Sequence, residues 1–153
     1  MMKLARLGHV ALRVADVERS KKFYGEVLGF EVIEEDLEHG GVFMALAGLS
    51  HTIDLFQAPE ASPSATPGAV GVRHIAFLVE SEADFKAAWR TLREQGVAID
   101  RALDHISQKS IYFHDPDGNY LEIYFELPNA PELFREGRQD RDQPLVFEKR
   151  ASS

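Results

Sequence analysis

Residues Ser110–Phe125, SIYFHDPDGNYLEIYF, decide the fold of this chain. On both sides of the tetrapeptide 115–118, apolar side chains alternate with polar or tyrosine side chains, and a period of two predicts β-strands. Within the tetrapeptide, proline presets φ and glycine accepts a positive φ, which is the chemistry of a tight turn. The stretch therefore predicts a hairpin with one aliphatic and aromatic face and a second face that carries Tyr112 and Glu122.

Glu122 is the residue of this hairpin that needs an explanation. It stands between Leu121 and Ile123 in the middle of the second strand. Burying a carboxylate there costs free energy unless something positive meets it. A positive or metal-bound partner for this carboxylate is therefore expected elsewhere in the chain.

The composition is that of an ordinary globular protein. The chain has 153 residues, 44% hydrophobic and 27% charged, enough for one domain with a sizeable core. The net charge of −8 argues against nucleic acid or an anionic membrane as partner. No apolar run approaches the roughly 20 residues of a membrane span, and residues 1–10 lack the apolar region of a signal peptide, so we expect a cytoplasmic protein. Without cysteine, a metal site can use only histidine and carboxylate ligands.

Two blocks of the sequence repeat the order strand, helix, strand, strand, strand. We place the first βαβββ module at residues 1–57 and the second at 72–127. The segment 58–71 is rich in proline and small residues and is typical of a linker. The polar segment 128–153 is expected to be a C-terminal tail that packs on a neighbour or is disordered.

Each block contains one amphipathic helix. Asp16 and Ser81 are the expected N-caps, and Gly29 and Gly96 are the expected ends. The spacing of apolar residues in the second helix predicts that Trp89 is buried between the helix and the sheet.

The two blocks also place the same residue types at matching positions. His74 follows His9 by 65 residues, and Glu122 follows Asp54 by 68 residues, a drift that loops absorb. Two such modules side by side would point all four side chains into one concavity. We therefore expect an α+β fold in which two βαβββ modules form one curved eight-stranded mixed sheet around a metal cavity, with the helices outside.

His9, His74 and Glu122 are the candidate metal ligands. Two imidazoles and one carboxylate with open coordination positions form the ligand set of non-haem Fe(II) oxygenases. The same set accepts Mn, Zn or Ni. Taken singly, each residue is as well explained as a satisfied polar side chain on a half-exposed sheet face. The matched positions in a duplicated block favour the metal site.

The chain resembles the vicinal oxygen chelate superfamily, which includes glyoxalase I, bleomycin and fosfomycin resistance proteins and extradiol dioxygenases. The resemblance covers about residues 4–127. Its motifs are LGHVALRVAD at 7–16, FYGEVLGFEV at 23–32, VRHIAF at 72–77 and DPDGNYLEIY at 115–124.

Two further stretches, LSHTIDLF and DHISQKSIYF, resemble catechol 2,3-dioxygenase-type segments. This resemblance implies that His51 acts as an acid–base group, and that His105 and Tyr112 hydrogen-bond substrate and oxygen intermediates. From the residues alone, His105 is equally a polar loop residue and Tyr112 an aromatic residue at a cavity rim. His51 has the parity of Ile53, so it reaches the cavity only from a bend or a strand end.

Asp54 points toward a different branch of the superfamily. It stands where glyoxalase-type members carry a fourth metal ligand, usually glutamate, and where dioxygenase-type members carry a residue that does not bind the metal. Because aspartate is one methylene shorter, three roles stay open: a fourth ligand, a ligand through water, or a polar lining residue.

The resemblance implies three functions. The first is a metal-dependent extradiol-type dioxygenase that acts on a catechol-like small aromatic substrate with O2, with Fe(II) as the expected divalent metal. The second is a glyoxalase-like lyase or isomerase in which Asp54 completes the site. The third is a bleomycin-resistance-type protein that binds a small molecule without turnover. Many relatives are homodimers, so we expect a homodimer.

Overall fold

The computed structural model describes residues 1–36, 38–46, 48–64, 66–137 and 141–147. The chain packs into two compact units. The first comprises Met1–Ala69 and Asp115–Gly118, and the second comprises Val70–His114 and Asn119–Ser153. The predicted module, linker and tail boundaries stay a proposal, and residues 138–140 and 148–153 of the predicted tail lie outside the described residues.

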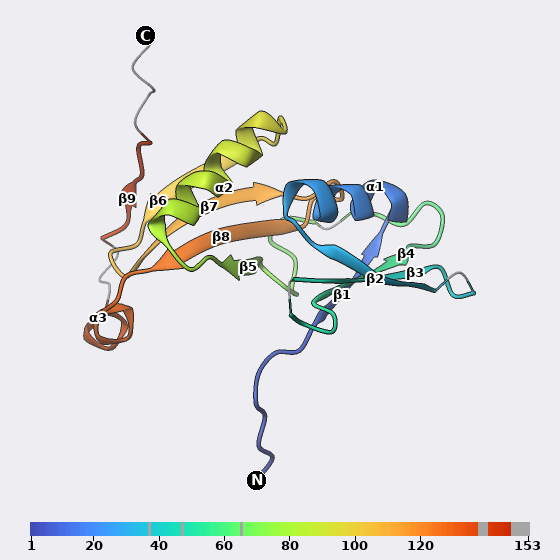
Figure 1. The fold of residues 1–153 in the computed structure, drawn as a ribbon, viewed down its shortest axis with the longest axis horizontal. Coiled ribbons are helices and arrows are strands. Elements are labelled where there is room, and N and C mark those ends of the chain that lie inside the picture. The colour runs from blue at the N-terminus through green and yellow to red at the C-terminus, as the bar shows by residue number, and fades with distance from the viewer. Residues whose placement is uncertain (37, 47, 65, 138–140, 148–153) are drawn as a thin grey trace. The chain divides into compact units, whose positions relative to one another are not determined.

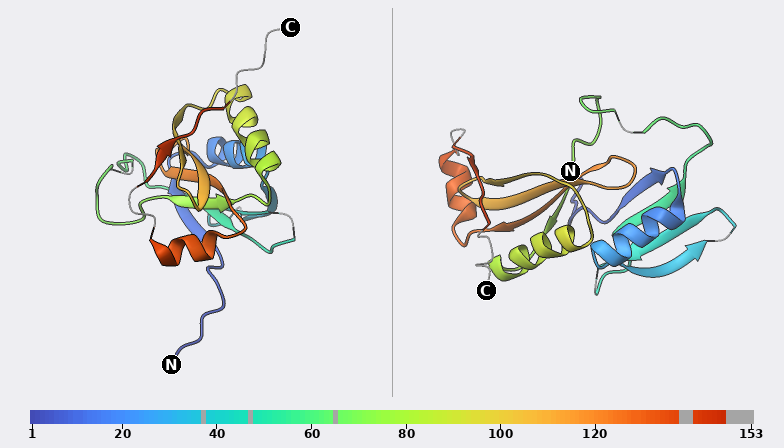
Figure 2. Two further views of the ribbon diagram at one scale, coloured as in Figure 1. Left: turned by 90° about the vertical axis from the view of Figure 1, so that its left-hand side faces the viewer. Right: turned by 90° about the horizontal axis from the view of Figure 1, so that it is seen from above.

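The first unit is a four-stranded sheet with one helix (Figure 1). Its strands stand in the order β1-β4-β3-β2, with β1 parallel to β4 and the other pairs antiparallel. The helix packs on β3 and β4 and covers one face of the sheet (Figure 2). The elements are β1 (Val10–Val14), α1 (Val17–Lys22), its π-helical continuation η1 (Phe23–Val27), β2 (Glu31–Asp36), β3 (Gly41–Ala45) and β4 (Ile53–Gln57).

The helix of the first unit begins and ends as its sequence predicts. The Asp16 side chain accepts a hydrogen bond of 2.9 Å from the Arg19 N–H, which satisfies one of the unpaired donors of the first turn. Gly29 follows η1 with φ of 77°, a conformation that costs glycine little. The buried Tyr24 hydroxyl donates to Asp115 Oδ2 at 2.9 Å. The turn 115–118 is thus bound to this helix.

The second unit is a five-stranded sheet with two helices. Its strands stand in the order β5-β8-β7-β6-β9, with β5 parallel to β8. The Ser81 side chain caps α2 by accepting from the Asp84 N–H, and Gly96 follows the helix with φ of 70°. The elements are β5 (Ile75–Leu78), α2 (Glu82–Glu94), β6 (Ile99–Asp104), β7 (Gln108–His114), β8 (Tyr120–Glu126), α3 (Ala130–Glu136) and β9 (Gln143–Pro144).

The predicted α+β class and the two βαβββ modules are confirmed. The strands differ from the prediction in their grouping, because they form hydrogen-bonded sheets of four and five strands instead of one eight-stranded sheet. The ninth strand, β9, and helix α3 come from the segment that was expected to be a tail that packs on a neighbour or is disordered. Pro131 in the first turn of α3 fits a helix start, since its missing N–H is not needed there.

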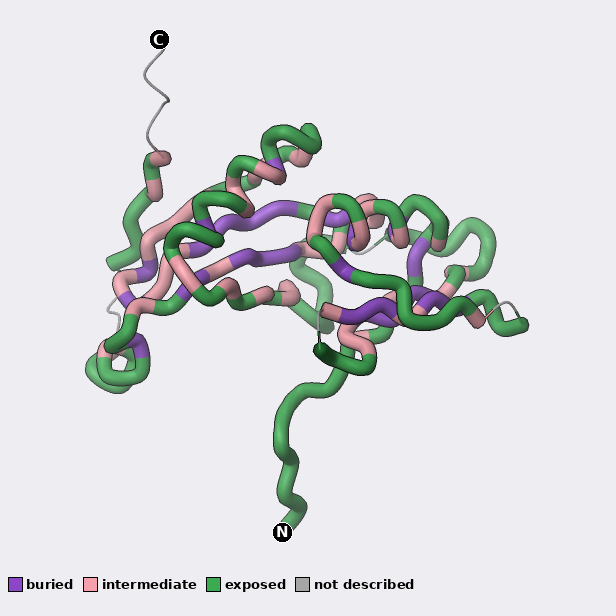
Figure 3. The backbone as a smooth tube through the Cα atoms, viewed as in Figure 1, coloured by how far each residue is buried: buried purple, intermediate pink, exposed green. Residues whose placement is uncertain are grey.

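The strand register shows the internal duplication directly. Ala11 pairs with Asp54 between β1 and β4, and Ala76 pairs with Glu122 between β5 and β8. Each alanine stands two residues after His9 or His74, so each histidine lies on the same side of its sheet as the carboxylate. The buried residues concentrate on the central strands of both sheets (Figure 3).

The β6–β7 connection is shorter than the sequence predicts. Residues 103–109 were expected to form a polar loop, but Leu103 and Asp104 extend β6, and β7 begins at Gln108. Asp104 pairs with Lys109 on β7, and Leu103 pairs with Pro144 on β9. These pairings provide hydrogen-bond partners for backbone groups of the predicted loop. His105 therefore lies in a tight turn.

Trp89 is half-buried, so the prediction that it lies in the seam between α2 and the sheet is wrong. Phe85 and Leu92 occupy that seam, since they are the buried residues of the helix. Trp89 lies beside their stripe and stacks on Phe147 with ring centroids 4.5 Å apart. The helices of the described chain include none long and apolar enough to cross a membrane.

Candidate functional site

The first unit brings His9, His51 and Asp54 together. His9 Nε2 lies 3.6 Å from Asp54 Oδ2, and His51 Nδ1 donates to Asp54 Oδ1 at 2.7 Å. The two imidazole rings stack with centroids 4.3 Å apart. Asp54 is 3% exposed, whereas the His9 side chain is 46% exposed. One nitrogen or oxygen from each residue lies within 4.8 Å of the others, so this group can hold a metal ion.

His51 reaches this group because it is not part of a strand. β4 begins at Ile53, and the bend at Thr52 releases His51 from the alternation that would turn it to the helix side. The condition that the sequence set for His51, a position at a bend or strand end, is met. Residue parity alone gave the opposite face.

In the second unit, three side chains contact the Glu122 carboxylate. His74 Nε2 lies 3.0 Å from Glu122 Oε2. The Tyr112 hydroxyl and the Gln108 amide each donate to Glu122 Oε1 at 3.1 Å. These contacts solvate a carboxylate that is 3% exposed, which explains how it tolerates burial.

His105 extends this network by one residue. Its Nε2 lies 2.9 Å from the Tyr112 hydroxyl, and His105 is buried. A chain of contacts thus runs from His105 through Tyr112 to Glu122, and Tyr112 sits directly opposite Glu122 in the β7–β8 pairing. Two predicted catalytic residues and one predicted metal ligand meet here.

Gln108 is the residue of this group that the sequence interpretation missed. It has the parity of Ser110 and Tyr112 on β7, so a strand drawn two residues longer would have placed it on the face of Glu122. The predicted loop at 103–109 concealed that pattern.

The donor geometry fits a divalent metal. Two ligand atoms with bonds of roughly 2.0–2.3 Å at angles near 90–110° lie about 3–4 Å apart. The His74–Glu122 and His9–Asp54 pairs, at 3.0 and 3.6 Å, have that spacing. The predicted triad takes His9 from the first unit and His74 and Glu122 from the second, so the triad stays a prediction.

Tyr112 remains a neutral phenol over the physiological range. Burial and the nearby Glu122 carboxylate raise the pKa of Tyr112 to about 12. At neutral pH its hydroxyl therefore keeps its proton and donates it within the network.

We predict that the native protein holds less tyrosinate at pH 10 than the denatured protein. The pKa of each of the four tyrosines, Tyr24, Tyr112, Tyr120 and Tyr124, is raised chiefly by burial. Ultraviolet titration should show ionisation at higher pH in the folded protein than in denaturant, where it should lie near the ordinary value of about 10. The folded state holds protons that the unfolded state releases, so stability should fall as pH rises from about 10 to about 12. A native titration midpoint near 10 would contradict this.

A sequence profile described as the "Glyoxalase/Bleomycin resistance protein/Dioxygenase superfamily" matches residues 6–123. The chain belongs to this superfamily. The resemblance seen in the sequence is thereby confirmed. Superfamily members bind a divalent metal and include dioxygenases, a glyoxalase and transferases.

The relatives of this superfamily member are named for different activities, and some are uncharacterized. Biphenyl-2,3-diol 1,2-dioxygenase 2 of Rhodococcus globerulus is 28% identical over 148 residues, which cover 95% of this chain and 77% of that protein. The uncharacterized protein YwkD of Bacillus subtilis is 36% identical over 130 residues, 80% of this chain and 98% of that protein. A solved glyoxalase/dioxygenase from Nostoc punctiforme matches with a TM-score of 0.66 and 27% identity, covering 83% of this chain and 98% of that one. The expected homodimer and cytoplasmic location stay predictions.

Proposed function

We propose that this superfamily member is a metal-dependent extradiol-type dioxygenase that cleaves a catechol-like small aromatic substrate with O2. The proposed ligands are His9, His74 and Glu122, and the proposed metal is Fe(II). The observation that carries the proposal is the Tyr112 hydroxyl, which lies between His105 Nε2 and Glu122 Oε1. A diol is also what the name of the Rhodococcus relative specifies as its substrate.

The His105–Tyr112 pair supports catalysis over simple binding. A protein that only sequesters a ligand has no need for two buried groups that can exchange a proton beside a metal-ligand candidate. In the proposed reaction, the His105–Tyr112 pair hydrogen-bonds oxygen atoms on which negative charge develops, with the Tyr112 hydroxyl as the donor. Tyr112 is suited to this, since its raised pKa keeps it a donor.

A bound divalent metal would supply Lewis-acid chemistry that makes the hydroxyls of a chelating diol more acidic. A basic side chain must then accept a proton from the diol, and we assign that role to His51. Its Nδ1 donates to Asp54, which fixes the ring and leaves Nε2 as the basic atom. Asp54 is then the orienting partner of a base, which keeps the metal triad at three protein ligands.

A glyoxalase-like lyase or isomerase is the second candidate. Asp54 favours it, because its register opposite Ala11 matches that of Glu122 opposite Ala76. Its Oδ2 also lies 3.6 Å from His9 Nε2, a distance that two ligands of one ion can have. In that enzyme Asp54 would be a fourth ligand to Zn, Ni or Mn, and no O2 would be consumed.

Two variants are expected to separate the candidates. In a dioxygenase, Asp54→Ala should leave metal content near that of the unaltered protein. His105→Ala should lower turnover by about 10²-fold or more with the metal still bound, because His105 contacts reacting oxygens rather than the ion. Metal content is measured by elemental analysis, and turnover by oxygen uptake with catechols after Fe(II) reconstitution.

His39→Ala is a matched control for His105→Ala. His39 is an exposed histidine that contacts Asp36, a residue with no role in either proposed function. It should change neither metal content nor turnover. Loss of metal in Asp54→Ala with an indifferent His105→Ala would reject the dioxygenase and favour the lyase or isomerase. A protein that takes up no metal would favour the binding protein.

A further inference from the structure

The chain after α3 returns to the second unit and forms β9. Pro144 pairs with Leu103 and Gln143 pairs with Asp104, and the Leu145 N–H donates to the Ala102 carbonyl at 2.9 Å. This segment follows the residues 6–123 that the superfamily profile matches. It is fixed along β6, the strand that leads directly into His105.

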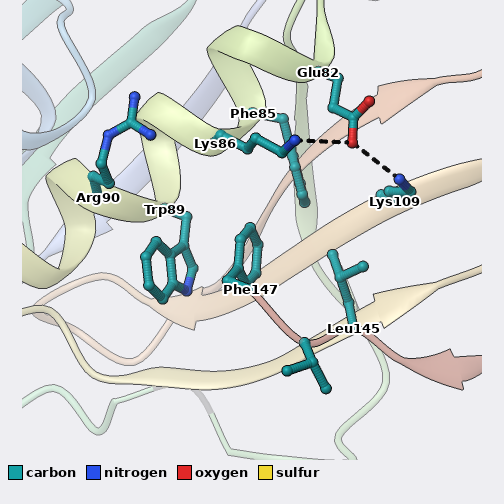
Figure 4. A pocket seen from close by; sticks show the side chains of 9 residues that line it. Glu82, Phe85, Lys86, Trp89, Arg90, Lys109, Leu145 and Phe147 are labelled. Carbon is teal, nitrogen blue, oxygen red and sulfur yellow. Dashed lines mark hydrogen bonds and ion pairs between the residues drawn. The ribbon is translucent and has the colours of Figure 1, made fainter. Parts of the chain in front are cut away.

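Aromatic stacking on α2 anchors the far end of this segment (Figure 4). The Phe147 ring lies 4.5 Å from the Trp89 ring and 5.7 Å from the Phe85 ring, both in stacked arrangements. These three aromatic residues line a pocket of about 330 Å³, and Leu145 lines it as well. Burying these apolar rings stabilises the contact. Residues 143–147 are thus held by backbone pairing and by side-chain packing.

Anchored in this way, the segment brings Asp142 to His105. Asp142 Oδ1 lies 2.8 Å from His105 Nδ1. The approach is not aligned as a hydrogen bond, so the buried Nδ1 atom lacks one in this conformation. The His105 side chain is 9% exposed and that of Asp142 is 41% exposed. Leaving a buried ring nitrogen without a hydrogen bond costs free energy, so a carboxylate at this distance is favoured as its partner.

The turn that carries His105 fixes its backbone but not its ring. Ile106 has φ of 73°, an unfavourable value for a β-branched residue. Its N–H donates to Asp104 Oδ1 at 2.8 Å, and the His105 N–H donates to the Gln108 carbonyl at 2.8 Å. The ring orientation is left to the side-chain contacts with Tyr112 and Asp142.

We propose that Asp142 is a positioning residue that sets the tautomer of His105. This inference rests on the proposed dioxygenase function for its catalytic meaning. A carboxylate at Nδ1 keeps the proton of a neutral imidazole on that atom, which leaves Nε2 as an acceptor facing the Tyr112 hydroxyl. Tyr112 has one proton for two acceptors, His105 Nε2 and Glu122 Oε1. Asp142 thereby decides where that proton goes.

The test is nitrogen NMR of the protein labelled with ¹⁵N-histidine, recorded without metal or substrate at a pH where His105 is neutral. The His105 resonances should show the proton on Nδ1 in the unaltered protein. Asp142→Ala should move it to Nε2, whereas Asp142→Asn should retain it on Nδ1, because an amide oxygen still accepts. Trp89→Ala, which releases the Phe147 anchor, should resemble Asp142→Ala. Gln143→Ala, an exposed change on β9, should match the unaltered protein.

Kinetics gives the catalytic half of the test. Asp142→Ala should lower kcat for ring cleavage about 10- to 100-fold with little change in KM, and Asp142→Asn should recover most of it. A His105 spectrum that is unchanged in Asp142→Ala overturns the inference. If the spectra change as expected but no variant, nor the unaltered protein, cleaves a diol, the proposed function fails while the positioning role stands.

Discussion

Replacing Glu122 with glutamine is expected to abolish ring cleavage, lowering turnover by about 10³-fold or more. The change removes the negative charge that a divalent metal requires from its carboxylate ligand while keeping the side chain's size. It also places an amide beside the Tyr112 and Gln108 donors that now meet Glu122 Oε1. Metal affinity should fall by about 10²-fold or more. Metal titration of the purified protein, followed by oxygen uptake, measures both effects.

Glu126→Gln is the control for this experiment. Glu126 lies on β8 four residues from Glu122, and it is exposed. Its replacement makes the same chemical change on the same strand, so metal affinity and turnover should match those of the unaltered protein. Full metal affinity in Glu122→Gln would show that Glu122 is not a ligand.

Tyr112→Phe is expected to lower kcat by about 10²- to 10⁴-fold and to leave metal binding intact. The change removes only the hydroxyl that lies between His105 and Glu122. Phenylalanine fills the same volume, and Tyr112 is a central residue of β7 with a ring that stacks on Tyr120, so the fold should survive. Single-turnover kinetics with the metal-loaded variant separates a slow chemical step from weak substrate binding.

The matched control for this change is Tyr124→Phe. Tyr124 stands on the neighbouring strand β8, two residues from Glu122, and pairs with Ser110. Losing its hydroxyl should leave kcat within about twofold of the unaltered protein. Equal losses in both variants would mean that the hydroxyls act on stability rather than on reacting oxygens.

Local chemistry made most of the fold predictable. The hairpin at 110–125 follows from alternation and from the Pro-Asp-Gly turn, where Gly118 has φ of 85°. Both predicted N-caps form, because a short polar side chain before an apolar helix face has one favourable role. The duplicated register could be read from His9, His74 and the two carboxylates. The grouping into two sheets could not, since it depends on which strand edges pair across the molecule.

The strand within the C-terminal tail was not predicted, and the reason is physical. β9 has only two residues, and its pairing with β6 is stabilised by the stack of Phe147 on Trp89, far from it in sequence. A polar segment of this kind has no period that marks a strand. The same tertiary contact explains why Trp89 lies at the edge of the α2 stripe, covered by the tail rather than by the sheet.

Part of the candidate site could be predicted from the sequence. His74 and Glu122 follow from strand parity, and their contact at 3.0 Å agrees with it. His51 followed from resemblance, while its parity alone gave the wrong face, because parity ends where β4 begins at Ile53. Asp142 could not be found from sequence, since only the course of the tail brings it to His105.

The crystal structure of the protein loaded with Fe(II) under anaerobic conditions tests the central claim most directly. The account predicts one ion bound by His9, His74 and Glu122 through bonds of roughly 2.0–2.3 Å, with positions left open for a diol and O2. His51 and Asp54 should contact each other and not the ion. An ion held instead by the group His9, His51 and Asp54, with Glu122 turned away from it, would contradict the account.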